Sequence, residues 1–307
     1  MSLLPSPFIT PLVSILNPLS RFLCRTFPSL RPFLWKRLIQ PKLCWRDFPF
    51  EVPSETGLLI AGSTVDVIQR YLYYFGNWEP PVCGFIQRSL QPGDVFVDVG
   101  ANIGYLTLIG AQRVGPQGKV IAIEASEETF AKLRANITRN GMKQVHPIWG
   151  AVSDQPGQVT LFKGPKTNSG LASMIRNNEA ETEEIVEARP LGQWLELEDI
   201  SRIRMIKIDV EGAEMLVSRG LVPLLELLPE RAEILMEISP ALMSEQDQLS
   251  LMAIFSKAGF RMFCLPEDSI DAYLYPGKYS GATARLREGL LSERLDVVFS
   301  RSKENVL

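Results

Sequence analysis

Residues 94–105, which read DVFVDVGANIGY, decide the fold that we expect for this chain. The run from Val95 to Val99 is short, apolar and rich in β-branched residues, as in a buried strand. Gly100 and Gly104 follow it, and a second apolar run over 119–124 comes next. A strand, a glycine-containing turn, a helix and a parallel strand form a βαβ unit, and in an open α/β sheet that turn lies at the ligand crevice.

The same alternation of strands and helices continues toward the C-terminus. Ser126 and Ser244 are expected to cap helices that end near Gly141 and Gly259. Another helix is expected around 284–291. Further apolar runs predict strands at 205–210, 234–238, 260–265 and 295–300, and His146 begins one more. Strands that alternate with helices predict a doubly wound α/β fold with a mostly parallel sheet and right-handed crossovers.

The composition is that of an ordinary globular protein. The 307 residues are 46% hydrophobic and 22% charged, which argues against collagen-like, wholly disordered and multi-spanning membrane proteins. Four cysteines lie far apart and His146 is the single histidine, so neither a disulfide framework nor a zinc site is expected. These features favour a reducing, cytoplasmic compartment.

The N-terminal segment differs from the rest of the chain in charge. Residues 1–50 contain seven basic side chains against Asp47 alone, so they carry +6 and the remaining residues carry −9. Prolines at 5, 7, 11 and 18 argue against a spanning helix, and no basic region precedes the apolar stretch as in a secretory signal. We expect a basic, Pro- and aromatic-rich extension over 1–50 and one domain over 51–307. Packing on that domain and peripheral contact with an anionic membrane both suit the extension.

The chemistry of the glycine-containing turn favours a cationic cofactor. Its spacing is G-x-N-x-G, and Asp98 stands two residues before Gly100. A dinucleotide would bring a pyrophosphate to this turn, where the carboxylate would repel it. S-adenosylmethionine instead carries an ammonium and a sulfonium, and Glu124 at the end of the second strand is placed to accept hydrogen bonds from ribose hydroxyls.

A cluster of acids follows the strand at 205–210. Asp209 and Glu211 are candidates to hold or deprotonate an acceptor, and Glu214 can begin the next helix. Glu237, in the neighbouring apolar strand, is a third candidate for the same role. The alternative is that Asp209 and Glu237 are structural acids that pair with Lys207. His146 is a weaker base candidate because a lone histidine in a strand is usually structural. The acidic run 179–187 is interpreted as a solvated loop or helix face.

The sequence resembles the FkbM family of S-adenosylmethionine-dependent methyltransferases. The resemblance covers about residues 70–300 and rests on GNWEP at 76–80, FVDVGANIG at 96–104, EA at 124–125, VSD at 152–154 and KIDVEGAE at 207–214, with Asn136 and Asn140. It implies a Rossmann-like class I sheet of seven strands, mostly parallel with the last strand antiparallel, flanked by helices. It also implies O-methylation of hydroxyls on sugars and other natural products. The cofactor-binding residues that it implies are Glu79, Asp98, Gly100, Asn102, Gly104, Glu124, Ser153 and Asp154.

The sequence also allows two other functions. An NAD-dependent oxidoreductase and a non-catalytic binding protein that retains the fold are the alternatives. A nucleic-acid substrate is not expected, because the body is acidic and the motifs of base methylation are absent. No metal is expected. A small-molecule or glycan acceptor is expected to bind between the segments 273–281 and 168–176, with a contribution from the N-terminal extension.

Overall fold

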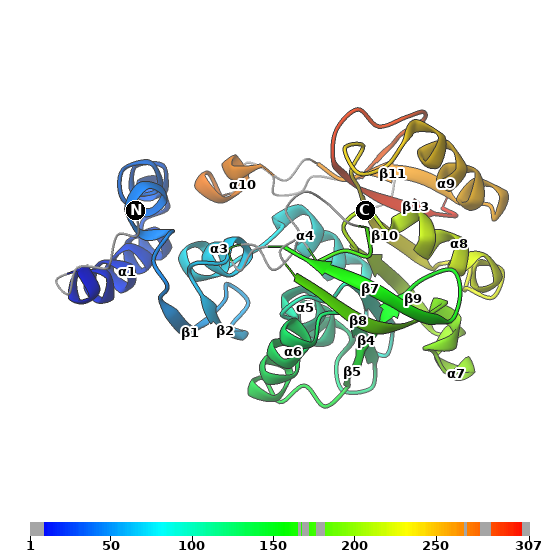
Figure 1. Cartoon of the computed structure of the whole chain (residues 1–307), viewed down its shortest axis with the longest axis horizontal. Coiled ribbons are helices and arrows are strands. Elements are labelled where there is room, and N and C mark those ends of the chain that lie inside the picture. Colours follow the sequence, from blue (N-terminus) through cyan, green and yellow to red (C-terminus); the bar gives the residue numbers. More distant parts are fainter. Residues whose placement is uncertain are drawn as a thin grey trace. The chain divides into compact units, whose positions relative to one another are not determined.

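The computed structural model describes residues 9–164, 167, 172–175, 182–266, 269–276 and 284–302 (Figure 1). Contacts divide the chain into two compact units. The first contains the described residues up to Pro80, together with Thr167 and residues 269–276. The second contains the remaining described residues.

The second unit is built on an eight-stranded sheet with the order β12-β11-β13-β10-β9-β3-β4-β5. Its strands β10, β9, β3, β4 and β5 run parallel to one another. Strand β13 is antiparallel to both β10 and β11, as expected for the last strand. The bounds are β3 Val95–Val99, β4 Lys119–Glu124, β5 Val145–Trp149, β9 Ile203–Ile208, β10 Glu233–Ile238, β11 Arg261–Cys264, β12 Arg285–Leu286 and β13 Leu295–Ser300.

Helices cover this sheet and bury its central strands. Every residue of β3 and β10 is buried, which explains why both read as continuous apolar runs rather than alternating ones. Helices α5 and α6 pack beside β3, β4 and β5, while α8 and α9 pack together beside β10 and β11 (Figure 1). The helices are α4 Pro80–Ser89, α5 Tyr105–Val114, α6 Glu127–Arg139, α7 Leu197–Ile200, α8 Glu214–Leu225 and α9 Glu245–Lys257, with the short 3₁₀ turn η4 Leu191–Gln193.

The expected helix starts are confirmed by their capping hydrogen bonds. The Ser126 side chain accepts from the backbone N–H of Thr129 at the start of α6, and Ser244 accepts from the N–H of Asp247 at the start of α9. Glu214 begins α8, where its charge suits the positive end of the helix dipole.

Two sequence predictions about secondary structure are wrong. The acidic run 179–187 was expected in a loop or helix face, but its described part lies in the strand β8 Thr182–Arg189, which buries Val186 and Ala188. Strand β8 pairs with β7 Gly157–Lys163 and β6 Ala151–Val152 in a separate three-stranded sheet. Its alternation of acidic and apolar residues matches the period of a strand with one buried face.

The helix expected around 284–291 is also absent from the described residues. Residues 285 and 286 instead form β12, an edge strand that pairs with β11 and adds an eighth strand to the expected seven. Gly289 has a φ of 85°, a left-handed conformation that ends any helical path there.

The first unit combines the N-terminal helices, a hairpin and two later helices. Arginines join them through backbone carbonyls: Arg25 donates to Phe75 O, and the buried Arg31 donates to Cys24 O and Tyr273 O. The domain boundary expected at residue 50 falls inside this unit, at the start of its hairpin. Its elements are α1 Ile9–Thr26, η1 Pro28–Leu30, α2 Arg31–Leu34, the π-helix η2 Trp35–Leu43, β1 Pro49–Pro53, β2 Leu59–Ser63, α3 Val67–Phe75 and α10 Ile270–Leu274.

No helix in the described residues has both the length and the apolar character needed to cross a bilayer. Pro18 lies inside α1, which is the longest of the N-terminal helices.

The turn after β3 approaches β9 so closely that only glycine fits. Gly100 has a φ of 76°, and a Cβ on it would lie 1.8 Å from the backbone oxygen of Asp209. Gly141, at the end of α6, has a similar φ of 64° but no atom within 4 Å of such a Cβ. Alanine at either position would be strained by the left-handed backbone, but only at position 100 would it also overlap with a neighbouring atom.

We predict that Gly100→Ala destabilises the protein far more than Gly141→Ala. Both substitutions place alanine in a left-handed conformation, at a cost of about 1 kcal/mol. Gly100→Ala must also displace the backbone at Asp209, for roughly 2–4 kcal/mol more. Denaturant unfolding of both variants measures the difference, and equal losses of stability would contradict the close approach.

Candidate active site

Glu124 holds the turn between β3 and α5 in place. Its two carboxylate oxygens accept from the backbone N–H of Asn102 at 2.8 Å and of Ser126 at 2.9 Å. Asn102 itself has a φ of 52°, which asparagine tolerates better than most residues. Burial raises the pKa of Glu124 to about 7, against the opposing effect of the Ser126 and Asn102 N–H groups. A carboxylate has about four acceptor positions, so two remain for donors such as the hydroxyls of a ribose.

Asp98 is buried beneath this turn. One of its oxygens accepts from the Thr107 hydroxyl at 2.6 Å, and the other lies 3.5 Å from the Lys207 ammonium. That second oxygen has no hydrogen-bond partner among the described atoms. The expectation that Asp98 favours a cofactor cation stays a prediction, and the structure adds that Lys207 is a resident cation beside it.

Lys207 connects three groups at the carboxyl ends of β3 and β9. Besides Asp98, its ammonium lies 3.2 Å from Asp209 Oδ2 and 3.4 Å from the carbonyl oxygen of Gly100. The pairing of Lys207 with Asp209 is confirmed. Its pairing with Glu237 is wrong, because the partner of Glu237 is Arg294.

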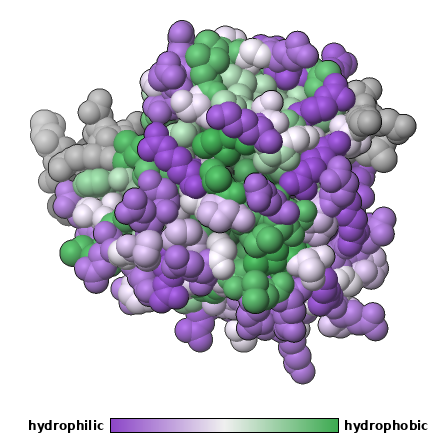
Figure 2. All heavy atoms as spheres, turned by 90° about the vertical axis from the view of Figure 1, so that its right-hand side faces the viewer, coloured by the Kyte–Doolittle hydropathy of each residue, from purple (hydrophilic) through white to green (hydrophobic). Residues whose placement is uncertain are grey.

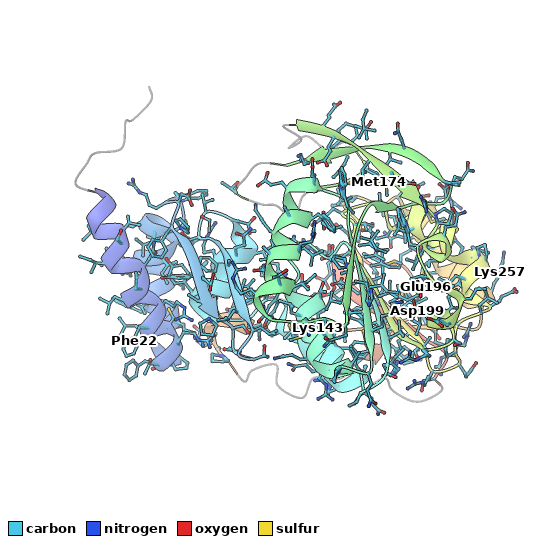
Figure 3. All side chains as sticks on the ribbon, turned by 90° about the horizontal axis from the view of Figure 1, so that it is seen from below. Phe22, Lys143, Met174, Glu196, Asp199 and Lys257 are labelled. Atoms are coloured by element: carbon cyan, nitrogen blue, oxygen red, sulfur yellow. The ribbon has the colours of Figure 1, made fainter. Side chains whose placement is uncertain are left out.

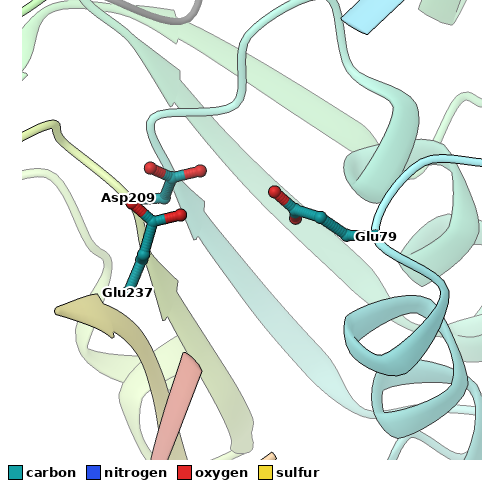
Figure 4. A group of neighbouring side chains, drawn as sticks. All are labelled: Glu79, Asp209 and Glu237. Atoms are coloured by element: carbon teal, nitrogen blue, oxygen red, sulfur yellow. The ribbon is translucent and has the colours of Figure 1, made fainter. Parts of the chain in front are cut away.

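Asp209 and Glu237 lie side by side at the ends of adjacent strands (Figure 4). A carboxylate oxygen of one lies within 4.8 Å of an oxygen of the other. Burial raises the pKa of Glu237 above its usual range, and the charge of Asp209 raises it further, whereas the guanidinium of Arg294 opposes both. The site thus concentrates negative charge where strands β9 and β10 end.

Glu211 completes the acid cluster of Asp209, Glu211 and Glu237. It has a φ of 51° and is half-buried, and burial together with the charge of Asp209 raises its pKa to about 7. The Ser173 hydroxyl donates to its backbone oxygen at 2.6 Å. Ser173 belongs to the segment 168–176 that was expected at the acceptor pocket; residues 172–175 are described, and the rest of that segment lies outside the described residues.

Ser153 and Asp154, expected near the adenine, follow β6. Their side chains lie 3.3 Å apart, and Gly220 of α8 packs so closely that a Cβ there would lie 2.2 Å from Ser153 O. This part of the chain lies beside the carboxyl end of β4, because the N–H of Gly150 donates a hydrogen bond to the carbonyl oxygen of Glu124. Their role toward a cofactor stays a prediction.

The remaining expected site residues are Glu79, the segment 273–281 and His146. Glu79 belongs to the first unit, where its backbone N–H donates a hydrogen bond to the Tyr273 hydroxyl oxygen at 2.9 Å. The role of Glu79 toward a cofactor stays a prediction. Part of the segment 273–281 lies outside the described residues. His146 is exposed on β5.

Arg294 and Thr107 are site residues that the sequence predictions missed. The sequence does contain a signal for Arg294, because it directly precedes β13 and an antiparallel last strand starts where its parallel neighbour ends. The pairing of Ile238 with Leu295 places the start of β13 at the carboxyl end of β10. No comparable sequence signal marks Thr107.

Comparison with known proteins points to methyl transfer. The model of the Methyltransferase FkbM domain matches residues 98–262. "Methyltransferase 1" of Beauveria bassiana is 34% identical over 150 residues, which are 42% of this chain and 59% of that protein. The 31-O-demethyl-FK506 methyltransferase FkbM of Streptomyces tacrolimicus is 31% identical over 148 residues, with 47% of this chain and 52% of that protein covered.

One more relative and one solved structure are also similar to this chain. The hexuronic acid methyltransferase AglP of Haloferax volcanii is 25% identical over 150 residues, covering 48% of this chain and 58% of that protein. The crystal structure of Methyltransferase FkbM from Methylobacillus flagellatus superposes with a TM-score of 0.45 at 15% identity, covering 74% of this chain and 49% of that one. The chain spans little more than half the length of these three curated relatives.

Glu214 provides a test of the electrostatics of the site. It is buried at the start of α8, where its carboxylate accepts from the N–H of Gly212, and burial raises its pKa to about 7. Between its usual pKa and 7, the folded protein therefore binds more protons than the unfolded chain. Linkage then requires stability to fall as pH rises through this window, by up to about 3 kcal/mol for one such group.

We predict that Glu214→Gln flattens this pH dependence. The free energy of unfolding of the variant should fall less than that of the wild type between pH 5 and pH 8, because glutamine has no proton to lose. The exposed Glu198→Gln serves as the matched control and should keep the wild-type slope. Denaturant titrations across this range measure both, and a variant with an unchanged slope would contradict the raised pKa.

Proposed function

Because the chain belongs to the FkbM methyltransferase family, we propose that it transfers a methyl group from S-adenosylmethionine to a hydroxyl of a sugar, glycan or small natural product. The matched residues 98–262 include the turn after β3, Glu124 and the acid cluster. The names of two relatives give 31-O-demethyl-FK506 and a hexuronic acid as what those proteins methylate. They support a hydroxylated acceptor for this chain.

The hydrogen-bond acceptors at the carboxyl ends of β3 and β4 suit this cofactor. Glu124 retains free acceptor positions for ribose hydroxyls, and Asp98 has a buried oxygen that lacks a hydrogen bond among the described residues. The turn from Asp98 to Gly104 would hold the methionine part, with Ser153 and Asp154 near the adenine. Bound S-adenosylmethionine would supply a methyl group on a sulfonium, a leaving group that departs as a neutral sulfide.

The observation that carries the proposal is the state of the three acids. Asp209 is paired with Lys207 and Glu237 with Arg294, whereas Glu211 has no ion-pair partner among the described residues and a pKa of about 7. A base works best when its pKa is near the working pH. Glu211 would therefore take the proton of the acceptor hydroxyl as its oxygen attacks the methyl carbon, while Asp209 and Glu237 position the acceptor.

Cofactor binding can be measured without knowing the acceptor. We predict that the purified protein binds S-adenosylmethionine in isothermal titration calorimetry, and that Glu124→Gln weakens binding roughly 10- to 100-fold by removing charge-assisted hydrogen bonds. Glu198→Gln should bind as the wild type does. Titration with NAD tests the oxidoreductase alternative, and preference for NAD over S-adenosylmethionine would overturn the cofactor assignment.

The role of Glu211 appears in the pH dependence of the rate. With labelled S-adenosylmethionine and an acceptor fraction from glycan or metabolite extracts, kcat/KM should rise with pH through about 7, because the base must lose its proton before it acts. Glu211→Gln should lower the rate about 10²- to 10⁴-fold and remove this rise. A variant that keeps the wild-type rate and profile, with S-adenosylmethionine binding intact, would exclude Glu211 as the base.

A further inference from the structure

Helix α1 exposes its apolar side chains. Leu12, Ile15, Leu19 and Phe22 have exposed fractions of 55%, 64%, 48% and 57%. Their spacing of three and four residues places them on one face of the helix. Figure 3 shows Phe22 on this helix, at the edge of the molecule. A surface helix normally turns such a face inward.

The face that α1 turns inward carries polar groups. Asn17 and Ser20 are almost completely buried, beside the buried Val13 and Cys24. Tyr74 donates its hydroxyl to Asn17 Oδ1, but Asn17 Nδ2 and Arg21 Nε have no hydrogen-bond partner among the described atoms. Burying polar groups costs free energy, so the fold keeps the apolar face outward despite a disadvantage in water.

The exposed apolar face continues beyond the end of α1. Phe27, Leu30 and Phe33, on the turn η1 and the helix α2, are all exposed, and so is Trp45 just after η2. Together with Leu12, Ile15, Leu19 and Phe22 these residues form what we call the N-terminal apolar face. This many exposed apolar side chains on consecutive elements favours an interaction site. The face drawn in Figure 2 also carries hydrophobic side chains, gathered in patches among hydrophilic ones.

Positive charge accompanies the N-terminal apolar face. Lys36, Arg37 and Lys42 are exposed on η2, and the sequence contains no Asp or Glu before Asp47. Arg21, Arg25 and Arg31 are held inside the unit by backbone carbonyls, so the exposed cations are those of η2.

We propose that the N-terminal apolar face lies in the headgroup region of an anionic membrane. Aromatic and aliphatic side chains would enter the boundary with the acyl chains, and the three exposed cations of η2 would contact lipid phosphates. Only one side of α1 is apolar, so the helix lies in the plane of the membrane rather than across it. A second copy of this chain is a poorer occupant, because a two-fold interface would bring two copies of the same uncompensated cations together.

Vesicle flotation of the full chain tests this proposal. The wild type should float with vesicles of phosphatidylcholine containing a third phosphatidylglycerol, and much less with phosphatidylcholine alone. Ile15→Glu with Phe22→Glu should reduce binding about tenfold or more, because both side chains would leave the membrane. Lys36→Gln with Arg37→Gln should reduce binding to the anionic vesicles about fivefold per charge.

The controls separate membrane contact from misfolding and from self-association. Leu197→Glu removes an even more exposed apolar side chain from the second unit and should bind as the wild type does. Circular dichroism should show that all variants are folded, and S-adenosylmethionine binding should be unchanged, since neither pair of substitutions lies in the site. The proposal is overturned by a wild type that does not float, by equal flotation of the Ile15/Phe22 variant, or by a lipid-free dimer that this variant abolishes.

Discussion

The site depends on one buried ammonium group. Lys207 stands between Asp98 on β3 and Asp209 after β9, and it also lies near the carbonyl oxygen of Gly100. Lys207 and Asp98 are buried and Asp209 is half-buried. Burying charges is costly, and the cost is offset only while the opposite charges stay together. Loss of the cation would leave two carboxylates a short distance apart with no compensation. The turn that follows β3 and the acids that follow β9 therefore form as one structure.

The same charge arrangement connects stability with function. Burial, together with smaller contributions from neighbouring acids, raises the pKa values of Glu124, Glu211 and Glu214 to about 7. The protein thus holds several carboxyls at the ends of β4 and β9 that resist ionisation. A cationic ligand at these strand ends would favour the ionised forms of these carboxyls. Part of its binding free energy would therefore come from its attraction to the carboxylates. Perturbed pKa values of this kind are typical of functional sites.

The sequence predicts an element correctly where its local apolar pattern matches its burial in the folded protein. Strands β3, β4 and β13 begin and end at the predicted residues, because their apolar runs are buried on both faces. The sequence predictions fail where a distant partner decides the outcome. Residues 285 and 286 form a strand only because β11 offers a free edge, and Glu237 pairs with Arg294 only because β13 returns antiparallel to β10. The burial of Asn17 and Ser20 on the inner face of α1 could not be predicted either, because amphipathicity alone places the apolar side chains inside.

Identification of the product is the sharpest test of methyl transfer from S-adenosylmethionine to a hydroxyl. S-adenosylmethionine that carries a ¹³C-labelled methyl group would be incubated with the protein and with fractionated glycan and metabolite extracts, and the products examined by NMR. The wild type should form a product with the labelled methyl bonded to oxygen, and Glu211→Gln should not. A labelled methyl on nitrogen, sulfur or carbon would contradict the proposed O-methylation.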